Sequence, residues 1–233
     1  MSLLLDCSLA NAAAIASPTV GTGAGAFASP STTFSGGHAI MTAKEDVIQF
    51  RQTDGVTANV NLARGRYRIR FNPTVLSSSN YKLAFGSIGT WRGPASVNML
   101  EWGRMNQSNN HNIRVIYYDA EGIRHEHAYP KTAWAPLFVK GTWIDTFDLS
   151  WDWTVEPDVP NLQLSAGGII IPPSLYWISG VPQMPPMRGP KSYVEASVDD
   201  WIGVGNRVED GGSPYMAGAW VEHVQIFDTP EGI

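Results

Sequence analysis

Acidic residues that share a strand face can act as the acid and base of a glycoside hydrolase, which needs two carboxyl groups beside the same bond. Asp145, Asp148 and Asp152 lie in an alternating stretch from 143 to 153. Strict alternation places Asp145 on one face and the other two on the opposite face. At ~3.3 Å per residue Asp148 and Asp152 are ~13 Å apart, beyond the ~9.5 Å of an inverting pair. We therefore expect no catalytic residues in this strand.

The run His125-Glu126-His127 is the second group of interest. Alternation places both imidazoles on one strand face, ~6–7 Å apart. With His111 as a third ligand they could bind a metal ion. The alternative, which we favour, is an exposed polar face on one arm of a hairpin. We expect no metal site and no cofactor, although a calcium ion held by backbone carbonyls would leave no trace in the sequence.

Three arginines, Arg66, Arg68 and Arg70, alternate along one face of a predicted strand. Such a row could bind phosphate or sulfate, but charged residues are mostly exposed, and we favour a solvated sheet face. The formal net charge is −5. Nucleic-acid binders present a basic surface to phosphates, so we expect no nucleic-acid partner.

The segment from Pro172 to Pro190 differs from the rest because it contains six prolines among aromatic and methionine residues. Prolines disfavour a central strand, so we expect a stiff loop insertion near 172–198. A stiff loop loses little entropy when it contacts a partner. The alternative is that Trp177 closes one end of the core. The predicted ligand or partner contacts are Tyr176, Trp177, Met184, Met187 and Arg188, with Trp91 from another Gly/Pro-rich turn.

The elements that hold these residues are predicted to be strands. The chain has 233 residues, of which 43% are hydrophobic and 16% charged, and this fits one all-β domain covering 1–233. Ala10 to Ala16 can form a short helical turn. Trp143, Trp151 and Trp153 are expected in the core. Alternating runs separated by glycine turns predict strands at 38–41, 47–51, 56–62, 66–71, 81–88, 97–105, 112–119 and 123–129.

The cysteine content and the hydropathy of the chain indicate in which compartment the protein is found. Cys7 is the only cysteine, so no internal disulfide can form, and we expect it to be a small buried side chain. No stretch reaches the ~18 apolar residues of a membrane span. The first residues also lack the basic start of a secretory signal. We expect a protein made in the cytoplasm without a signal peptide or carried on a virion surface, and not one that spans a membrane.

Four segments follow one another in an order that suggests a known fold. They are the opening strand Leu3-Leu4-Leu5-Asp6, the strand from Gly65 to Phe71, the strand from Thr146 to Trp153 with Leu162 to Gly168, and the closing segments 202–205 and 218–228. Together they resemble the concanavalin A-like lectin/glucanase superfamily in its laminin-G-like form, over nearly the whole chain. The resemblance implies a jelly-roll β-sandwich of two curved antiparallel sheets with neighbouring termini.

This sequence departs from the catalytic members of that superfamily. Their Glu-x-Asp-x-x-Glu run is absent, and Glu195, Asp199 and Asp200 have the wrong spacing. We therefore expect that the chain is not an enzyme but a structural or attachment module of a larger assembly. Decoration or fibre proteins of bacterial viruses are the nearest parallel, with other protein subunits or second copies of the chain as partners. The alternatives are a free carbohydrate-binding module that contacts glycans and, ranked last, a glycosidase or lyase.

Overall fold

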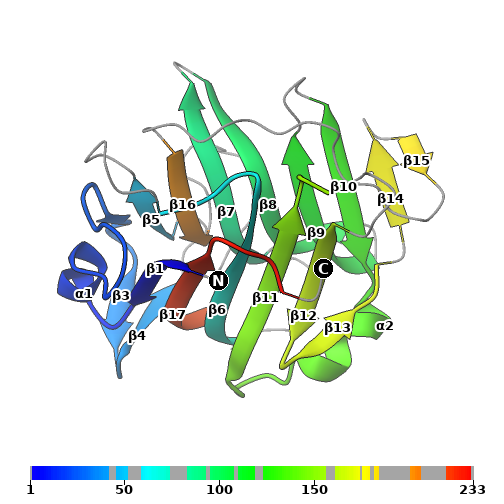
Figure 1. Cartoon of the computed structure of the whole chain (residues 1–233). Helices are drawn as coiled ribbons and strands as arrows, with labels where there is room; N and C mark the ends of the chain where they lie inside the picture. The colour runs from blue at the N-terminus through cyan, green and yellow to red at the C-terminus, as the bar shows by residue number, and fades with distance from the viewer. Residues whose placement is uncertain are drawn as a thin grey trace.

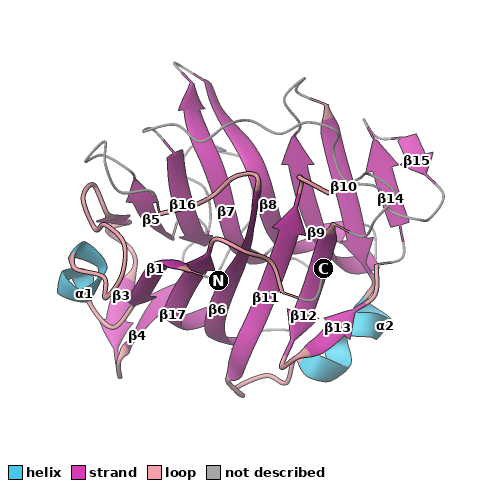
Figure 2. Ribbon diagram, viewed as in Figure 1, coloured by secondary structure: helices cyan, strands magenta, loops and turns pink. Residues whose placement is uncertain are grey.

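The computed structural model describes residues 2–41, 46–51, 59–73, 83–92, 95–107, 110–118, 123–155, 161–173, 175–178, 181–183, 200–205 and 219–231. Most of these residues form two antiparallel sheets, called sheet A and sheet B below (Figure 2). A shared hydrophobic core takes side chains from both sheets. The predicted all-β jelly-roll sandwich is confirmed.

Sheet A has eight strands within the described residues. Its order is β13-β12-β11-β6-β17-β4-β3, and β1 also pairs with β17. The strands are β1 (Leu3–Ser8), β3 (Thr33–Ser35), β4 (His38–Met41), β6 (Arg64–Pro73), β11 (Ile144–Asp152), β12 (Leu162–Ala166), β13 (Ile169–Ile171) and β17 (Ala219–Phe227).

Sheet B has nine strands within the described residues, in the order β15-β14-β10-β9-β8-β7-β16-β5-β2. The strands are β2 (Phe27–Ala28), β5 (Val47–Arg51), β7 (Leu83–Arg92), β8 (Ala95–Gln107), β9 (Asn110–Tyr118), β10 (Arg124–Tyr129), β14 (Leu175–Ile178), β15 (Val181–Gln183) and β16 (Asp200–Gly205).

The helices are short. They are α1 (Ala12–Ala16), α2 (Lys131–Trp134) and the 3-10 turn Ala135–Leu137. The helical turn predicted for 10–16 is confirmed, and the side chain of Asn11 caps it by accepting a 2.8 Å hydrogen bond from the Ala14 N–H. Within the part of the chain described here, no helix has the length and apolar character needed to cross a bilayer.

The core lies between the sheets and is rich in aromatic rings. Phe71 of β6 and Phe147 of β11 are both fully buried, with ring centroids 5.5 Å apart. Phe138, just after the 3-10 turn, lies 5.6 Å from the first ring and 5.0 Å from the second. The Tyr67 hydroxyl of β6 donates a 2.9 Å hydrogen bond to the carbonyl of Gly203 in β16. This bond connects sheet A to sheet B through the core.

Glycine meets a specific need at two places in sheet A. Gly167 and Gly168 form the turn between β12 and β13, with φ of 57° and 78°. Two central residues with positive φ match the type I′ hairpin turn. At Gly65 a Cβ would lie 2.7 Å from the Phe227 carbonyl oxygen and 2.8 Å from the Trp151 ring. No larger residue fits there without a shift of the backbone.

The first and last strands of the described chain, β1 and β17, pair side by side, in line with the neighbouring termini that the resemblance implies (Figure 1). The Ser2 N–H donates to Asp228 Oδ1 at 2.6 Å, and the Asp228 N–H donates to the Ser2 carbonyl at 3.0 Å. The chain then crosses the outer face of sheet A. We call residues Asp228–Glu231 the C-terminal segment. The Glu231 N–H donates to Ser150 Oγ at 3.3 Å, and the Glu231 carbonyl accepts from Gln163 at 3.4 Å.

Two predicted elements differ from the structure. Residues 59–62 of the strand expected at 56–62 are not strand, and the rest of that element lies outside the described residues. The proline-rich segment expected as a loop contains β14 and β15. Strand β14 has no proline, and β15, with Pro182, lies at the edge of sheet B, where the missing N–H is tolerated. Most of the remaining residues of 172–198 lie outside the described part.

Candidate functional site

Two β-bulges flank β6, one on each neighbouring strand. The register of β11 against β6 shifts between Ile144 and Phe147, and that of β17 shifts between Val221 and His223. Both shifts fall beside Arg70, and each inserts one extra residue. At each bulge two consecutive residues therefore face outward. Bulges re-aim side chains and are over-represented beside functional sites.

The bulges bring two carboxylates to one guanidinium. Arg70 Nε donates to Asp145 Oδ1 at 2.8 Å, and Arg70 Nη1 forms an ion pair with Glu222. Both carboxylates come from bulge residues, one from β11 and one from β17. All three side chains are partly or largely exposed. Exposed ion pairs contribute only about 0–1 kcal/mol to stability, so these pairs add little to the stability of the fold.

Aromatic rings extend this surface. His38 of β4 stacks on Trp220 with ring centroids 4.9 Å apart and contacts Trp143 edge-on at 5.5 Å. The Arg70 guanidinium lies 4.8 Å from the centroid of the Trp143 ring. Trp220 is 36% exposed. We call this group the aromatic site; its members are His38, Arg70, Trp143, Asp145, Trp220 and Glu222.

The bulge in β11 changes which tryptophans are in the core. Alternation predicts that Trp143, Trp151 and Trp153 are all buried. Trp151 and Trp153 are buried, but Trp143 is only partly so and lies on the outer face. Ile144 takes the inner position instead, opposite Phe71 of β6. The extra residue between Ile144 and Phe147 shifts the alternation by one position. The prediction that Trp143 lies in the core is therefore wrong.

The same bulge changes the acidic residues of β11. Alternation predicts Asp145 and Asp148 on opposite faces. Both are on the outer face, because Asp145 bonds to Arg70 and Asp148 accepts 2.6 Å and 2.7 Å hydrogen bonds from Arg68. Each carboxylate thus has an arginine of β6 as its partner.

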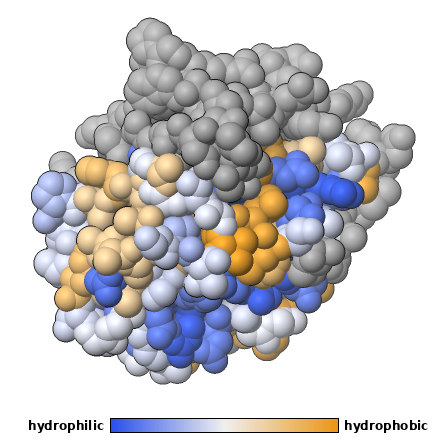
Figure 3. Space-filling model, turned by 60° about the vertical axis from the view of Figure 1, so that its left-hand side comes forward, coloured by the Kyte–Doolittle hydropathy of each residue, from blue (hydrophilic) through white to orange (hydrophobic). Residues whose placement is uncertain are grey.

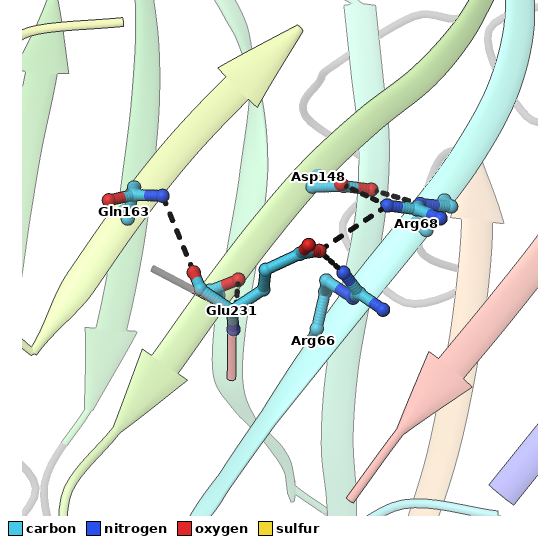
Figure 4. A network of polar contacts seen from close by, with 6 residues as sticks. Arg66, Arg68, Asp148, Gln163 and Glu231 are labelled. Atoms are coloured by element: carbon cyan, nitrogen blue, oxygen red, sulfur yellow. Dashed lines mark hydrogen bonds and ion pairs between the residues drawn. The ribbon is translucent and has the colours of Figure 1, made fainter. Parts of the chain in front are cut away.

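The arginine row of β6 is less exposed than predicted. Arg66 is only 3% exposed, so the expected solvated face is wrong at this position. Its guanidinium lies 4.0 Å from the centroid of the Phe227 ring and forms an ion pair with Glu231 (Figure 4). The physical reason is the C-terminal segment, which crosses this end of the row.

His125 and His127 face the core and not the solvent, so the expected exposed polar face is wrong. The His125 ring stacks on Tyr117 at 4.9 Å, and the Tyr117 hydroxyl lies 3.2 Å from His127 Nε2. Tyr117 also packs at 4.7 Å against Trp153, which follows β11. Burial, with a smaller contribution from His125, lowers the pKa of His127 to about 3. Among the described side chains no group of three is placed to bind a metal ion.

On the other face of β10, Glu126 is buried between two arginines. It forms ion pairs with Arg114 of β9 and with Arg124, the latter at 2.5 Å. In backbone register Glu126 pairs with Trp177 of β14 and with Ile116 of β9. This places one predicted contact residue beside a buried, fully compensated carboxylate.

The other predicted contacts are only partly described. Tyr176 lies on β14 opposite His127, and Trp91 lies in β7 opposite Ser96 and not in a turn. The side chains of Tyr176, Trp177 and Trp91 lie outside the described residues, as do Met184, Met187 and Arg188 entirely. These six contacts stay predictions. All the described ones lie in sheet B, whereas the aromatic site lies in sheet A.

Comparison with known proteins gives a fold but no family. No family model and no curated protein matches the sequence. The chain is similar to the receptor-binding domain of botulinum neurotoxin D, with a TM-score of 0.60 and 10% identity over 99% of this chain and 50% of that one. It is also similar to a Trypanosoma rangeli sialidase, with a TM-score of 0.57 and 11% identity over 99% and 31%. The binding domain of botulinum neurotoxin serotype G gives 0.55 and 10% over 99% and 49%.

These similarities correct one prediction and leave another without support. The chain spans half the length of these proteins or less, and at such low identity the likeness shows a shared lectin-like β-sandwich alone. Because a sialidase shares this fold, the fold contradicts the reasoning that the chain is not an enzyme, and that prediction is withdrawn. None of the three structures is a viral protein by its description, so the expected virion role gains no support.

Proposed function

We propose that this chain is a carbohydrate-binding module that holds a sugar against Trp143 and Trp220 on the outer face of sheet A. A sugar ring has C–H groups on its faces and hydroxyl groups around its edge. Indole rings present flat apolar faces with negative charge density, which suit the C–H groups. Carboxylate and guanidinium groups form strong charge-assisted hydrogen bonds with hydroxyls. The aromatic site has both kinds of group within one surface.

The paired bulges are the observation that carries this proposal. Without them Trp143 and Trp220 would continue the buried alternation of β11 and β17, and the carboxylates would not meet at Arg70. The rings also support one another through His38, so little entropy is lost on binding. Figure 3 shows that hydrophilic and hydrophobic residues adjoin on the side where α1, β3 and β4 come forward. Such a surface offers both hydrogen bonds and apolar contact.

The uses of the same fold in other proteins support a binding role. Two of the similar structures are receptor-binding or binding domains of botulinum neurotoxins. The sialidase was solved with 2,3-difluorosialic acid, a sugar derivative. Recognition of a sugar or a sugar-bearing receptor is the function that fits both the fold and the aromatic site.

The double variant Trp143→Ala/Trp220→Ala is expected to weaken glycan binding at least ~30-fold, because Trp-to-alanine changes at binding centres cost about 2 kcal/mol or more. The measurement is a glycan array to find a binding sugar, followed by calorimetric titration. Phe27→Ala is the matched control, since Phe27 is an exposed aromatic residue of sheet B. Unchanged affinity in the double variant would refute the site.

The predicted contacts of sheet B give the competing location. Trp91→Ala/Trp177→Ala is the second pair of variants for the same titration. Loss of binding in this pair, with full binding in Trp143→Ala/Trp220→Ala, would move the site to the strands β7 and β14. Loss of binding only in Trp143→Ala/Trp220→Ala supports the aromatic site.

A second candidate function is assembly with another copy of the chain, favoured by the exposed edge of sheet A. β13 ends this sheet in the described strand order, and its Ile169 and Ile170 are 56% and 58% exposed. An exposed apolar edge strand is a template for pairing with another chain. Ile170→Lys is expected to convert a self-associated form to monomer in light scattering. Val139→Lys, at an exposed residue outside the strands, should not. A wild-type chain that stays monomeric at high concentration would exclude this function.

A further inference from the structure

Two arginines of β6 share a partly enclosed site on the outer face of sheet A. The Arg66 side chain is almost fully buried and the Arg68 side chain is about three-quarters buried. Burial and the neighbouring positive charge of Arg68 both lower the pKa of Arg66. Asp148 takes two hydrogen bonds from Arg68. Two guanidinium groups and one carboxylate leave one positive charge for a further anion to balance.

Glu231 supplies that anion from the solvent side. Its carboxylate forms an ion pair with Arg66 Nη1 and lies 3.6 Å from Arg68 Nη2, so it bridges the two guanidinium groups (Figure 4). The Glu231 side chain is nevertheless 58% exposed. Two hydrogen bonds attach its backbone to the sheet, from Gln163 at 3.4 Å and to Ser150 at 3.3 Å. Both are longer than the ~2.9–3.0 Å typical of N–H···O bonds.

The backbone hydrogen bonds that hold Glu231 on the sheet are therefore weak, whereas the two arginines bind oxyanions strongly. An arginine fork matches the geometry of carboxylate and sulfate oxygens and remains charged at all physiological pH values. The exposed carboxylate that meets the fork belongs to the C-terminal segment, where the backbone of Glu231 is held by two long hydrogen bonds. An external anion would take the place of the Glu231 carboxylate against the two guanidinium groups.

We propose that Arg66 and Arg68 form a binding site for the sulfate or carboxylate group of an acidic ligand, and that Glu231 closes it as a displaceable internal ligand. Binding exchanges one oxyanion for another, and no covalent bond changes. Glu231 competes with the ligand as an intramolecular anion at high effective concentration. When Glu231 leaves the site, Arg66 Nη1 and Arg68 Nη2 can contact another anion in its place, while Arg66 stays packed against the Phe227 ring. This site is separate from the aromatic site, since Arg66 and Arg70 are ~13 Å apart along the strand.

The test compares Glu231→Gln with the wild type. Sodium sulfate and sodium acetate are titrated in turn at constant ionic strength with sodium chloride, and binding is followed by calorimetry and by Tm. Glu231→Gln is expected to bind sulfate or acetate at least ~10-fold more tightly than the wild type, since the competing carboxylate is gone. The anion that binds more tightly identifies the chemical group.

Two further variants make the result decisive. Asp6→Asn removes one negative charge from the same outer face, where Asp6 pairs with His223 and not with the arginines, and it should gain no anion affinity. Glu231→Gln/Arg66→Lys keeps the positive charge but removes the fork, and it should lose most of the gain. Equal gains in Glu231→Gln and Asp6→Asn, or no gain for either anion, would overturn the proposal. Sugar binding by the aromatic site would be unaffected by that outcome.

Discussion

Phe147→Ala is expected to lower the free energy of unfolding by about 3–5 kcal/mol, the usual range for deletion of a buried phenyl ring. Phe147 is fully buried between Phe71 and Phe138, with ring centroids 5.5 Å and 5.0 Å away. The two neighbours are fixed by β6 and by the 3-10 turn, so the cavity cannot collapse easily. Urea unfolding followed by tryptophan fluorescence measures the loss.

Thr146→Ala is the matched control because Thr146 is the preceding residue, at the bulge and partly exposed. Its change should stay within about 0.5 kcal/mol. A loss below about 1 kcal/mol for Phe147→Ala would contradict the packing described here, since a filled core position costs at least ~2 kcal/mol when it is emptied. The result also bears on the aromatic site, because Phe147 fixes the inner end of the bulge that exposes Trp143.

Acidification from pH 7 to pH 4 is expected to cost about 3 kcal/mol of stability through His127 alone, at ~1.4 kcal/mol per pH unit below the unfolded pKa. Burial lowers the pKa of His127 from 6.5 to about 3. Between these values the unfolded chain holds more protons than the folded chain. Stability therefore falls as the pH drops below about 6.5 and stops falling from this source near pH 3.

Urea unfolding at pH 7 and pH 4 tests this prediction with two variants. His127→Gln removes the titrating group, so its loss between the two pH values should be about 3 kcal/mol smaller than that of the wild type. Tyr117→Phe removes the hydroxyl that lies 3.2 Å from His127 Nε2 but keeps the imidazole, and it should retain most of the loss. The same loss in wild type and His127→Gln would show that the acid sensitivity arises elsewhere.

Alternation in the sequence predicted much of the fold. The strands expected at 38–41 and 47–51 match β4 and β5. In β4 the burial of the side chains alternates with a period of two, which places Ala39 and Met41 in the core. Local patterns of this kind determine which residues face inward as long as the register stays regular.

The aromatic site could not be predicted because it depends on two irregularities in register. Trp143 and Trp220 are apolar, so they fit a buried alternation as well as an exposed one, and an inserted bulge residue leaves no distinctive residue type. The sequence offered one signal. At each bulge two adjacent polar residues, Asp145-Thr146 and Glu222-His223, stand where strict alternation predicts a single polar residue. The six contacts predicted from proline and tryptophan content remain untested for a different reason, because their side chains lie outside the described residues.

Burial of polar residues was missed where the covering group is distant in sequence. Arg66 is covered by Phe227 and Glu231. The histidines of β10, in sheet B, face the core. They lie near Trp153, which follows β11 of sheet A. No local pattern reports such long-range contacts, so a solvated face was the natural expectation for both groups.

The antiparallel pairing of β1 with β17 has a mechanical consequence. Leu3 lies opposite Phe227, while the far end of the ladder joins Ser8 to His223. A pull applied through Ser2 and Asp228 therefore acts at one end of the ladder, across the strands. Such a load opens the hydrogen bonds one after another instead of shearing them all at once. Tension between these two residues would peel β1 away at low force before the rest of the sandwich bears any load.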